Sequence, residues 1–425
     1  MLSKQDNERV TRVSRGTPMG ETLRRYWVPA LLSSEIPEPD GDMARVRLLG
    51  EDLLAFRTTD GQAALTGALC PHRLAPLYFG RNEANGVRCV YHGWKFDSTG
   101  ACIHMPTEPP DSSYKDRVRI DAYPTHEAGG VIWAYLGPEV HMPPPPDWEL
   151  TRVPLEHSFV SRTVQDCNWL QALEGGLDSA HAMIMHNADG TNIDWIYDYD
   201  RLIPQIEVNP TEYGYSYTGI RERADDLWWV RLYQYFMPFT ALRGRVSPLR
   251  GAKQPPAMPT MCGHIWVPAD DVTTNVFNFI YAADPAIGMT REFAIENEID
   301  DGRGPQHLTP DLRLKLGLHN DYSLSRELQK TGNFAGIVGI NTQDVAVQEA
   351  MGPIVDRSQE HLGSTDRAIM QMRRMLLEAI GDVEAGRRPK GADTASYAQV
   401  RAVDHFVQGK ENIARVLLEE SKTRY

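Results

Sequence analysis

Two short stretches, Cys70-Pro71-His72-Arg73 and Cys89-Val90-Tyr91-His92, decide the fold of this chain. Sixteen residues separate His72 from Cys89, so two loops each offer one thiol and one imidazole. Residues that allow a tight return of the chain follow both pairs, Leu74-Ala75-Pro76 after the first and Gly93-Trp94 after the second. Thiolates and imidazoles are favoured ligands of transition metals, so four of them on two converging loops predict a metal centre.

Two kinds of metal centre use two cysteines and two histidines. A structural zinc site usually takes its cysteines from one short segment and its histidines from another. In this sequence each loop carries one of each, in the patterns C-x-H and C-x-x-H. A Rieske [2Fe–2S] cluster binds the cysteines through one iron and the histidines through the other. We therefore predict a Rieske cluster held by Cys70, His72, Cys89 and His92, with zinc as the alternative.

The composition limits the possible partners. The chain has 425 residues, enough for two domains with sizeable cores, and a formal net charge of −13. Nucleic acid is not expected as a partner, because phosphate groups attract clusters of Lys and Arg. No apolar run reaches the roughly 18 residues of a membrane span, and residues 1–7 lack the apolar core of a signal peptide. The three cysteines outside the loops do not suggest a disulfide framework. We expect a cytoplasmic protein with no membrane partner.

Three segments of the chain differ in pattern. Residues 1–26 look polar and helical, with a local break at Pro18 and Gly20. Residues 27–142 contain short apolar runs separated by Gly, Asp and Pro, which is typical of short antiparallel strands, and they include both cluster loops. Pro143–Pro146 cannot enter a helix or a central strand, so we place a stiff linker and the domain boundary there. Residues 147–425 then form a second domain.

Hydrophobic periodicity in the second domain predicts both helices and strands. Helices are expected at 168–185, 310–330 and 365–382, and strands at 213–223, 227–239 and 264–282. The fold class is therefore α+β, with an antiparallel β domain first. The tail after residue 390 carries mixed charge and is expected to wrap the surface or a neighbouring subunit.

A second group of possible metal ligands lies between residues 168 and 186. At about 100° per residue, Glu174, Asp178 and His181 lie within about 60° of one another on one helical face. His186 follows His181 by about 140° around a helix, so both imidazoles reach one ion only if the helix distorts or ends between them. Two histidines and one carboxylate on one face of an iron form the facial triad of non-haem Fe(II) oxygenases.

The combination of the two motifs resembles the α subunits of Rieske non-haem iron oxygenases, and in its details the phthalate dioxygenase type. The resemblance covers nearly the whole chain. Besides the cluster loops it includes the segments 16–20, 24–30, 46–53, 79–83 and 168–186. It implies an antiparallel β Rieske domain, followed by a helix-grip catalytic domain with an antiparallel sheet and long C-terminal helices.

The resemblance also implies the third iron ligand. In the family this ligand lies on a C-terminal helix behind the site, and residues 341–349 are similar to that element, with Asp344 at the ligand position. Glu349 and Asp356 are nearby alternatives. The implied cofactors are a [2Fe–2S] cluster and a mononuclear iron held by His181, His186 and Asp344.

The segment 168–186 carries one implied role and one departure from the family. The family's counterpart of Asp178 bridges a cluster histidine of one subunit to an iron histidine of the next, which implies a homotrimer or a hexamer of two stacked trimers. Many relatives carry an asparagine after the residue that matches Glu174, but here this position is Gly175. The active-site amide of the family is therefore not carried over, and Asn168, two turns earlier, is the nearest amide.

The resemblance implies a reaction that uses O₂ and electrons from NAD(P)H. A separate reductase with flavin and an iron–sulfur cluster should deliver the electrons, because the chain has no G-x-G-x-x-G fingerprint of its own. This type of oxygenase mostly acts on aromatic acids, and guanidinium groups suit a carboxylate. The candidate substrate contacts are Ser179, Arg221, Arg223, Arg231, Arg243 and Arg245. For each arginine the alternative is a solvated strand face with local ion pairs, such as Arg223 with Asp225.

Aromatic side chains in the second domain suggest a roomy pocket, although most such residues simply fill a core. The candidates are Trp169, Trp195, Trp228, Trp229 and Tyr233. We expect an enzyme that O-demethylates or hydroxylates an aromatic acid, with a methoxylated, lignin-derived acid favoured. The alternative within the class is cis-dihydroxylation of a phthalate or benzoate. A non-enzymatic Rieske electron carrier is the alternative from another class, and it would hold about two irons per chain where the oxygenase holds about three.

Overall fold

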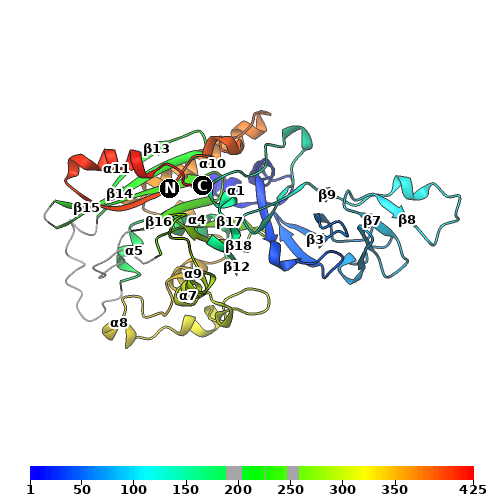
Figure 1. The fold of residues 1–425 in the computed structure, drawn as a ribbon, viewed down its shortest axis with the longest axis horizontal. Coiled ribbons are helices and arrows are strands. Elements are labelled where there is room, and N and C mark those ends of the chain that lie inside the picture. The colour runs from blue at the N-terminus through cyan, green and yellow to red at the C-terminus, as the bar shows by residue number, and fades with distance from the viewer. Residues whose placement is uncertain (188–202, 225, 247–257) are drawn as a thin grey trace.

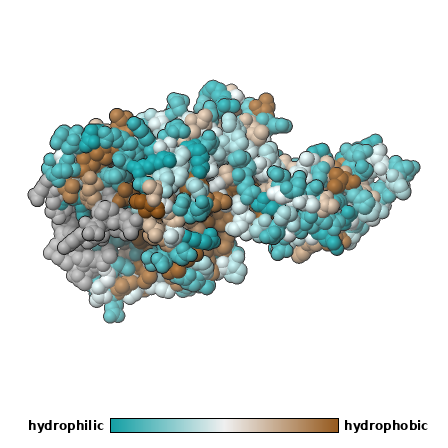
Figure 2. Space-filling model, in the orientation of Figure 1, coloured by the Kyte–Doolittle hydropathy of each residue, from teal (hydrophilic) through white to brown (hydrophobic). Residues whose placement is uncertain are grey.

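The computed structural model describes residues 1–187, 203–224, 226–246 and 258–425. They form a broad body and a narrower lobe that projects from it, as Figure 1 and Figure 2 show. The lobe is built by early residues, in blue and cyan in Figure 1, and the body contains the largest sheet and most of the helices.

The narrow lobe contains two antiparallel four-stranded sheets. In spatial order, the strands of the first are β2 (Ala44–Leu48), β3 (Glu51–Arg57), β4 (Ala63–Gly67) and β9 (Ala122–Tyr123). Those of the second are β5 (Arg81–Glu83), β6 (Gly86–Arg88), β7 (Lys95–Asp97) and β8 (Cys102–His104). The lobe has its own small hydrophobic core, which includes Phe56, Trp94 and both loop cysteines. The expected antiparallel β domain is thereby confirmed.

A three-stranded antiparallel sheet joins the lobe to the body. Its order is β1 (Trp27–Leu32), β11 (Val131–Tyr135) and β10 (Thr125–Ala128). Side chains of β1 and β11 belong to the main hydrophobic core, which continues through the body. Residues 142–147, which include the proline run, have no regular structure, because proline lacks the N–H that a ladder or a helix needs.

The N-terminal segment forms two helices, α1 (Lys4–Thr11) and α2 (Pro18–Leu23), which pack against α10 (Arg367–Glu384). Pro18 begins α2 and does not interrupt a helix. The backbone N–H at the first helical position has no acceptor within the helix, so proline is tolerated there. The Thr17 side chain caps this helix by accepting a hydrogen bond from the Gly20 backbone N–H at 3.2 Å.

The body is organised around one long antiparallel sheet. In spatial order its strands are β12 (Ser158–Gln165), β18 (Thr274–Ala282), β17 (Thr260–Pro268), β16 (Thr240–Arg245), β15 (Leu227–Phe236), β14 (Gly214–Ala224) and β13 (Gln205–Pro210). From the tail, β19 (Val403–Gln408) pairs with the first half of β15. The strand expected at 264–282 is a hairpin, because a backbone hydrogen bond of 2.9 Å from Ala269 to Thr273 closes a turn inside it.

Helices lie against this sheet and around its edges (Figure 1). They are α3 (Glu149–Arg152), α4 (Trp169–Leu177), α5 (His181–Ile184), α7 (Arg291–Asp300), α8 (Leu328–Thr331), α9 (Ile340–Ala350), α10 and α11 (Ile413–Glu420). The helix expected at 365–382 is confirmed as α10. Among the described residues, no helix has the length and apolarity that a bilayer crossing requires.

The prediction of a helix at 310–330 is wrong. That segment contains irregular turns, a short 3-10 element at Leu318–Ser323 and only the four-residue α8. Asp321, Tyr322 and Ser323 all have a positive φ, which no α-helix accommodates. The apolar residues Leu314, Leu316 and Leu324 instead pack beside Tyr322 against α9, so the packing of a loop produced the apolar pattern that suggested a helix.

Candidate metal centres and substrate cavity

The first candidate site begins where the predicted helix 168–185 breaks. Asn168 caps α4 by accepting a hydrogen bond from the Leu170 N–H at 3.1 Å, and its own amide donates to two carbonyls outside the site. α4 ends at Leu177, because Asp178 has an extended backbone and its carboxylate accepts from the Ala180 N–H at 2.7 Å. The break therefore falls before His181. With α5 starting at His181 and ending at Ile184, His186 follows just beyond the helix.

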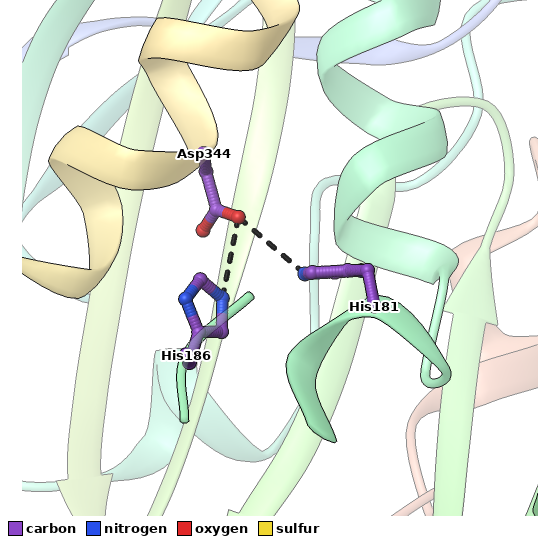
Figure 3. Close-up of side chains that lie close together, drawn as sticks. All are labelled: His181, His186 and Asp344. Carbon is purple, nitrogen blue, oxygen red and sulfur yellow. Dashed lines mark ion pairs between the residues drawn. The ribbon is translucent and has the colours of Figure 1, made fainter. Parts of the chain in front are cut away.

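His181, His186 and Asp344 converge from three places in the fold (Figure 3). The Nε2 atoms of His181 and His186 lie 3.4 Å and 3.3 Å from Asp344 Oδ1. One potential ligand atom from each residue lies within 4.8 Å of the other two. Among the described residues these are the only three His, Cys, Asp or Glu side chains that meet in this way. Two imidazoles and one carboxylate at this spacing fit a non-haem iron and leave coordination positions open.

The outer nitrogens of the two imidazoles have different partners. His181 Nδ1 lies 3.3 Å from Asp178 Oδ2, so this ring faces a carboxylate on each side. His186 Nδ1 donates to Gln343 Oε1 at 2.7 Å, and the amide of Gln343 in turn donates to the Ile337 carbonyl at 2.8 Å. Both contacts turn Nε2 inward, toward the position an ion would occupy.

The charges of the triad fit a cation. Burial lowers the pKa of His181, but hydrogen bonds with Asp178 and Asp344 outweigh burial and raise the pKa to about 10. Burial raises the pKa of Asp344, but its contacts with His181 and His186 outweigh it and hold the pKa well below the usual range of a carboxyl. Without a metal ion the site therefore keeps a proton that a bound ion would displace.

The alternative acidic ligands lie elsewhere. Glu349 accepts hydrogen bonds from the Tyr322 hydroxyl and from the Asp166 N–H. Asp356 is at the surface and accepts from Ser358. Glu174 points into a buried ion-pair network with two arginines. Of the acids considered in this part of the sequence, Asp344 alone joins the two histidines.

A cavity opens beside the triad. Its wall includes all three triad residues and Asp178, together with side chains from the large sheet and from α9. Of the predicted substrate contacts, Ser179, Arg231 and Arg243 line it, and Tyr233 is the one predicted aromatic residue that does so. Trp195 and Asp225 lie outside the described residues. Trp169 is fully buried in the main core.

The predicted arginines differ in their partners. Arg221 is buried and donates to the Ser179 carbonyl at 2.8 Å. Arg223 lies at a bulge where the pairing of β14 with β15 skips a residue, and it is not among the residues that line the cavity. Arg231 pairs with the buried Asp404 at 3.3 Å, and Arg245 lies 3.5 Å from Asp301.

Arg243 differs in its partners from Arg231, the other arginine on the cavity wall. Within the described parts of the chain it has no carboxylate within ion-pair distance, and its buried Nε has no hydrogen-bond partner. The Ser179 hydroxyl, on the same wall, is also buried without a partner in the described structure. Two polar residues on one cavity wall, each with an unsatisfied atom, favour a polar ligand in this cavity.

Sequence reasoning did not single out three polar residues of this cavity wall and its surroundings. Gln343 holds His186, and its only sequence signal is its place directly before Asp344. His264 lines the cavity with its Nδ1 2.8 Å from Asn278 Oδ1, and burial lowers its pKa to about 3, so this imidazole is neutral. Gln348 lies one helical turn beyond Asp344 and also lines the cavity. No local pattern distinguishes such glutamines from surface ones.

The second candidate centre lies at the two loops of the narrow lobe. Both loops close in the same way: Leu74 N–H donates to the Cys70 carbonyl at 2.8 Å, and Gly93 N–H donates to the Cys89 carbonyl at 3.0 Å. Leu74 and Gly93 both have a positive φ, which the tight return requires. The rings of His72 and His92 lie 4.3 Å apart between centroids.

The residues present at the loops fit a cluster. His72 Nδ1 is buried and has no hydrogen-bond partner in the described structure, so a metal is the natural partner for its lone pair. Trp94 stacks on the His72 ring at 4.5 Å and holds its orientation. Burial, with the Cys89 thiol close by, raises the pKa of Cys70 to about 11. Paired cysteines inside and imidazoles toward the surface match the donor set of a Rieske cluster.

Comparisons with known proteins agree with both centres. Residues 26–124 match the Rieske [2Fe–2S] domain family, and residues 134–417 match the family described as LigXa C-terminal domain like. The phthalate 4,5-dioxygenase oxygenase subunit of Pseudomonas putida is 36% identical, over 92% of this chain and 89% of its own. The 5,5'-dehydrodivanillate O-demethylase oxygenase subunit of Sphingobium sp. strain SYK-6 is 33% identical, over 92% of this chain and 83% of its own. The solved structure of Pseudomonas putida CBB5 NdmA shares the fold, with a TM-score of 0.62 and 18% identity over 91% of this chain and 97% of its own.

A Rieske lobe joined to a body with an iron-type triad defines a Rieske non-haem iron oxygenase. Within that class, the chain belongs to the phthalate dioxygenase type. It is the oxygenase subunit of a multicomponent system, so a separate protein supplies its electrons. Its cofactors are a [2Fe–2S] Rieske cluster and a mononuclear non-haem iron.

Proposed function

We propose that this oxygenase O-demethylates or hydroxylates an aromatic acid, with a methoxylated acid as the favoured substrate. The observation that carries the proposal is one cavity in which His181, His186 and Asp344 meet a cationic wall that includes Arg243. In this proposal the three residues hold the iron, and Cys70, His72, Cys89 and His92 hold the cluster. The bound iron and cluster together supply the activation of O₂.

Arg243 is the proposed receptor for the substrate carboxylate. A guanidinium forms paired hydrogen bonds with a carboxylate, and a partly buried one without an acidic partner gains most from such a ligand. Arg231 also lines the cavity but already pairs with Asp404. It therefore adds positive charge to the wall without being available to bind a carboxylate of the substrate. Ser179 supplies a hydroxyl beside the same position. Arg221, which donates to the Ser179 carbonyl, and Arg223 are not among the residues that line the cavity.

Demethylation has a defined balance. The methoxy acid, O₂, NAD(P)H and one proton give the phenol, formaldehyde, water and NAD(P)⁺. In this proposal the protein's own residues orient the methyl group toward the triad, and Tyr233 and Trp266 supply aromatic surface on the cavity wall. The relatives include one named for O-demethylation and one named for dioxygenation, so cis-dihydroxylation of a phthalate or benzoate is the second candidate.

A substrate panel separates the two candidates. The purified oxygenase, with a surrogate flavin and iron–sulfur reductase, is given vanillate, 5,5'-dehydrodivanillate, phthalate and benzoate. Formaldehyde in equal amount to consumed methoxy acid supports demethylation. A cis-dihydrodiol from phthalate or benzoate, without formaldehyde from any methoxy acid, would replace that proposal with dihydroxylation. If total iron is about two per chain and no acid is oxidised, the chain is an electron carrier.

Arg243 is tested by a matched pair of variants. Arg243→Gln should weaken binding of an aromatic acid by about tenfold or more, since a charged hydrogen bond of this kind contributes roughly 1.5–3 kcal/mol. Arg245→Gln, on the same strand but bound to Asn297 and Asp301, is the control and should leave binding unchanged. Equal binding by both variants would remove Arg243 from the substrate site.

The domain division and the assembly are part of the proposal. We infer a helical segment at 1–26, a Rieske domain at 27–142 and a catalytic domain at 147–425, in a cytoplasmic homotrimer or hexamer. Exposed apolar side chains surround the cluster loops, including Leu74, Phe79, Val90 and Tyr91. Such a patch favours a protein contact, and a neighbouring subunit that presents Asp178 would bring the cluster of one chain to the iron of the next.

A further inference from the structure

Gln348 of α9 and Gly175 of α4 are neighbours in the cavity wall. Both line the cavity that contains the triad. A Cβ atom placed on Gly175 would lie 2.1 Å from Nε2 of Gln348, far inside contact distance. The amide of Gln348 therefore occupies the space that any larger residue at position 175 would need.

The side chain of Gln348 is held on its oxygen side. Oε1 accepts a hydrogen bond of 2.6 Å from Gln165 Nε2, and both residues are buried. The backbone of the same residue is fixed too, because its carbonyl accepts from Gln171 at 2.9 Å. With the oxygen engaged, the Nε2 group is directed over Gly175 and along the cavity wall.

The nitrogen side of Gln348 differs from its oxygen side. Among the described residues, none accepts a hydrogen bond from Nε2. A buried amide that uses its acceptor and leaves two N–H groups unused loses free energy unless a ligand or water accepts from them. Gln348 lies four residues after Asp344 on α9, so it projects from the same helical face, one turn away.

We propose that Gln348 is a substrate-binding residue: its Nε2 group donates a hydrogen bond to an oxygen substituent of the aromatic substrate, and Gly175 leaves the room for it. The inference deepens the proposed function and rests on it, since it assumes an oxygen-bearing aromatic substrate in this cavity. Arg243 holds the charged end of the molecule, and Gln348 selects a neutral acceptor such as an ether or phenol oxygen near the triad.

Three variants test the pair. Gly175→Ala pushes the amide away without removing it, and alanine in place of glycine otherwise suits a helix. Gln348→Glu keeps the acceptor for Gln165 but removes both donors. The double variant Gly175→Ala with Gln348→Ala carries no amide to displace, and Gln348→Ala alone is its reference. Gly381→Ala is the matched helix control, because a Cβ there meets no atom within 4 Å.

The measurement is the dissociation constant of the anaerobic, reduced enzyme for phthalate, vanillate and 5,5'-dehydrodivanillate, together with iron content, Rieske absorbance and melting temperature. We expect Gly175→Ala and Gln348→Glu each to weaken binding of at least one acid about tenfold, as loss of a hydrogen bond predicts. In the Gln348→Ala background, Gly175→Ala should have no further effect, which marks the two residues as coupled. Iron content and Rieske absorbance should stay unchanged.

Two kinds of result overturn the inference, and they differ from failure of the proposed function. Wild-type affinity in both single variants, or a further loss from Gly175→Ala when residue 348 is alanine, means that Gln348 does not contact the substrate. Loss of iron or a large fall in melting temperature in Gln348→Glu would show a structural role instead. If wild-type enzyme binds none of the three acids, the proposed substrate class is wrong and this inference falls with it.

Discussion

At the scale of single residues, the two imidazoles of the triad are held unequally. The outer nitrogen of His181 contacts the carboxylate of Asp178, whereas that of His186 donates to the neutral amide of Gln343. A carboxylate makes an imidazole a stronger donor to a metal, and an amide mainly fixes its orientation. In the proposed iron site, His181 would therefore be a strengthened ligand and His186 a positioned one.

The role of Gln343 can be measured directly. Gln343→Ala should lower the affinity for Fe²⁺ by about tenfold to a hundredfold, the range found for lost partners of metal-binding histidines. Competition with a chelator under anaerobic conditions gives this affinity, and unchanged Rieske absorbance shows that the lobe is intact. Gln343→Glu should keep the affinity, because it still accepts from His186 Nδ1. Equal affinity of wild type and Gln343→Ala would mean that the contact with His186 does not position the ring.

The affinity for iron should also depend on pH. In the iron-free protein the pKa of His181 is about 10, so the imidazole is protonated at neutral pH. Metal binding must release that proton, and the affinity for Fe²⁺ should therefore rise with pH, by about tenfold per unit at most, up to about pH 10. Chelator competition at pH 6.5, 7.5 and 8.5 measures the slope. An affinity that is flat over this range would show that His181 is already neutral when the iron arrives.

At the scale of secondary-structure elements, buried polar contacts tie α4, which lies beside the site, to its neighbours. Glu174 of α4 accepts from Arg357 at 2.9–3.0 Å and from Arg373 of α10 at 2.6 Å. Arg373 also pairs with Glu360 at 2.5 Å. Charges removed from water in this way are stable only as a complete set.

Removal of Glu174 should therefore be costly. Glu174→Ala leaves two buried guanidinium groups without their shared carboxylate, and we expect a loss of about 3–5 kcal/mol in the free energy of unfolding. Urea denaturation followed by circular dichroism measures the change. Glu384→Ala removes the partner of Arg9 in an exposed ion pair and serves as the control, with an expected change below about 1 kcal/mol. Similar values for both variants would show that the network at α4 is not needed for stability.

At the scale of the whole molecule, the cluster and the iron site belong to different parts of one chain. The sheet that carries the second cluster loop lies at the far end of the narrow lobe, and α4, α5 and α9 lie in the body (Figure 1). Asp178 is about one-quarter exposed, although one of its oxygens faces His181. This partial exposure leaves room for the contact with another subunit that the proposed assembly requires.

The assembly proposal leads to a prediction for Asp178. Asp178→Asn preserves the shape of the side chain but removes its charge, and we expect turnover to fall at least a hundredfold while iron and cluster stay bound, because the link between centres is interrupted. Stopped-flow reoxidation of the reduced cluster by O₂ and substrate separates electron transfer from substrate binding. Sedimentation should give a trimer or hexamer for the wild type. A monomer with full turnover would exclude transfer between subunits.

Local sequence determined the parts of this protein whose partners lie close along the chain. The two cluster loops are short, their ligands are two and three residues apart, and a turn closes each, so spacing alone predicts the centre. The alternation in β14 and β15 likewise predicts a strand face, because it depends only on the pleat. The same logic failed at 310–330, where apolar residues follow the packing of a loop against α9 and not a helical period.

Only the tertiary structure decided which candidates act together. Glu349 and Asp344 lie on one helix, but in the folded chain Glu349 contacts Tyr322 and Asp344 contacts the two histidines. Arg231 and Arg243 both line the cavity, but strand β19, which comes from the tail, brings Asp404 to Arg231, and no described carboxylate pairs with Arg243. The physical reason is that burial and charge pairing depend on segments more than a hundred residues apart, and no local pattern records which of them will meet.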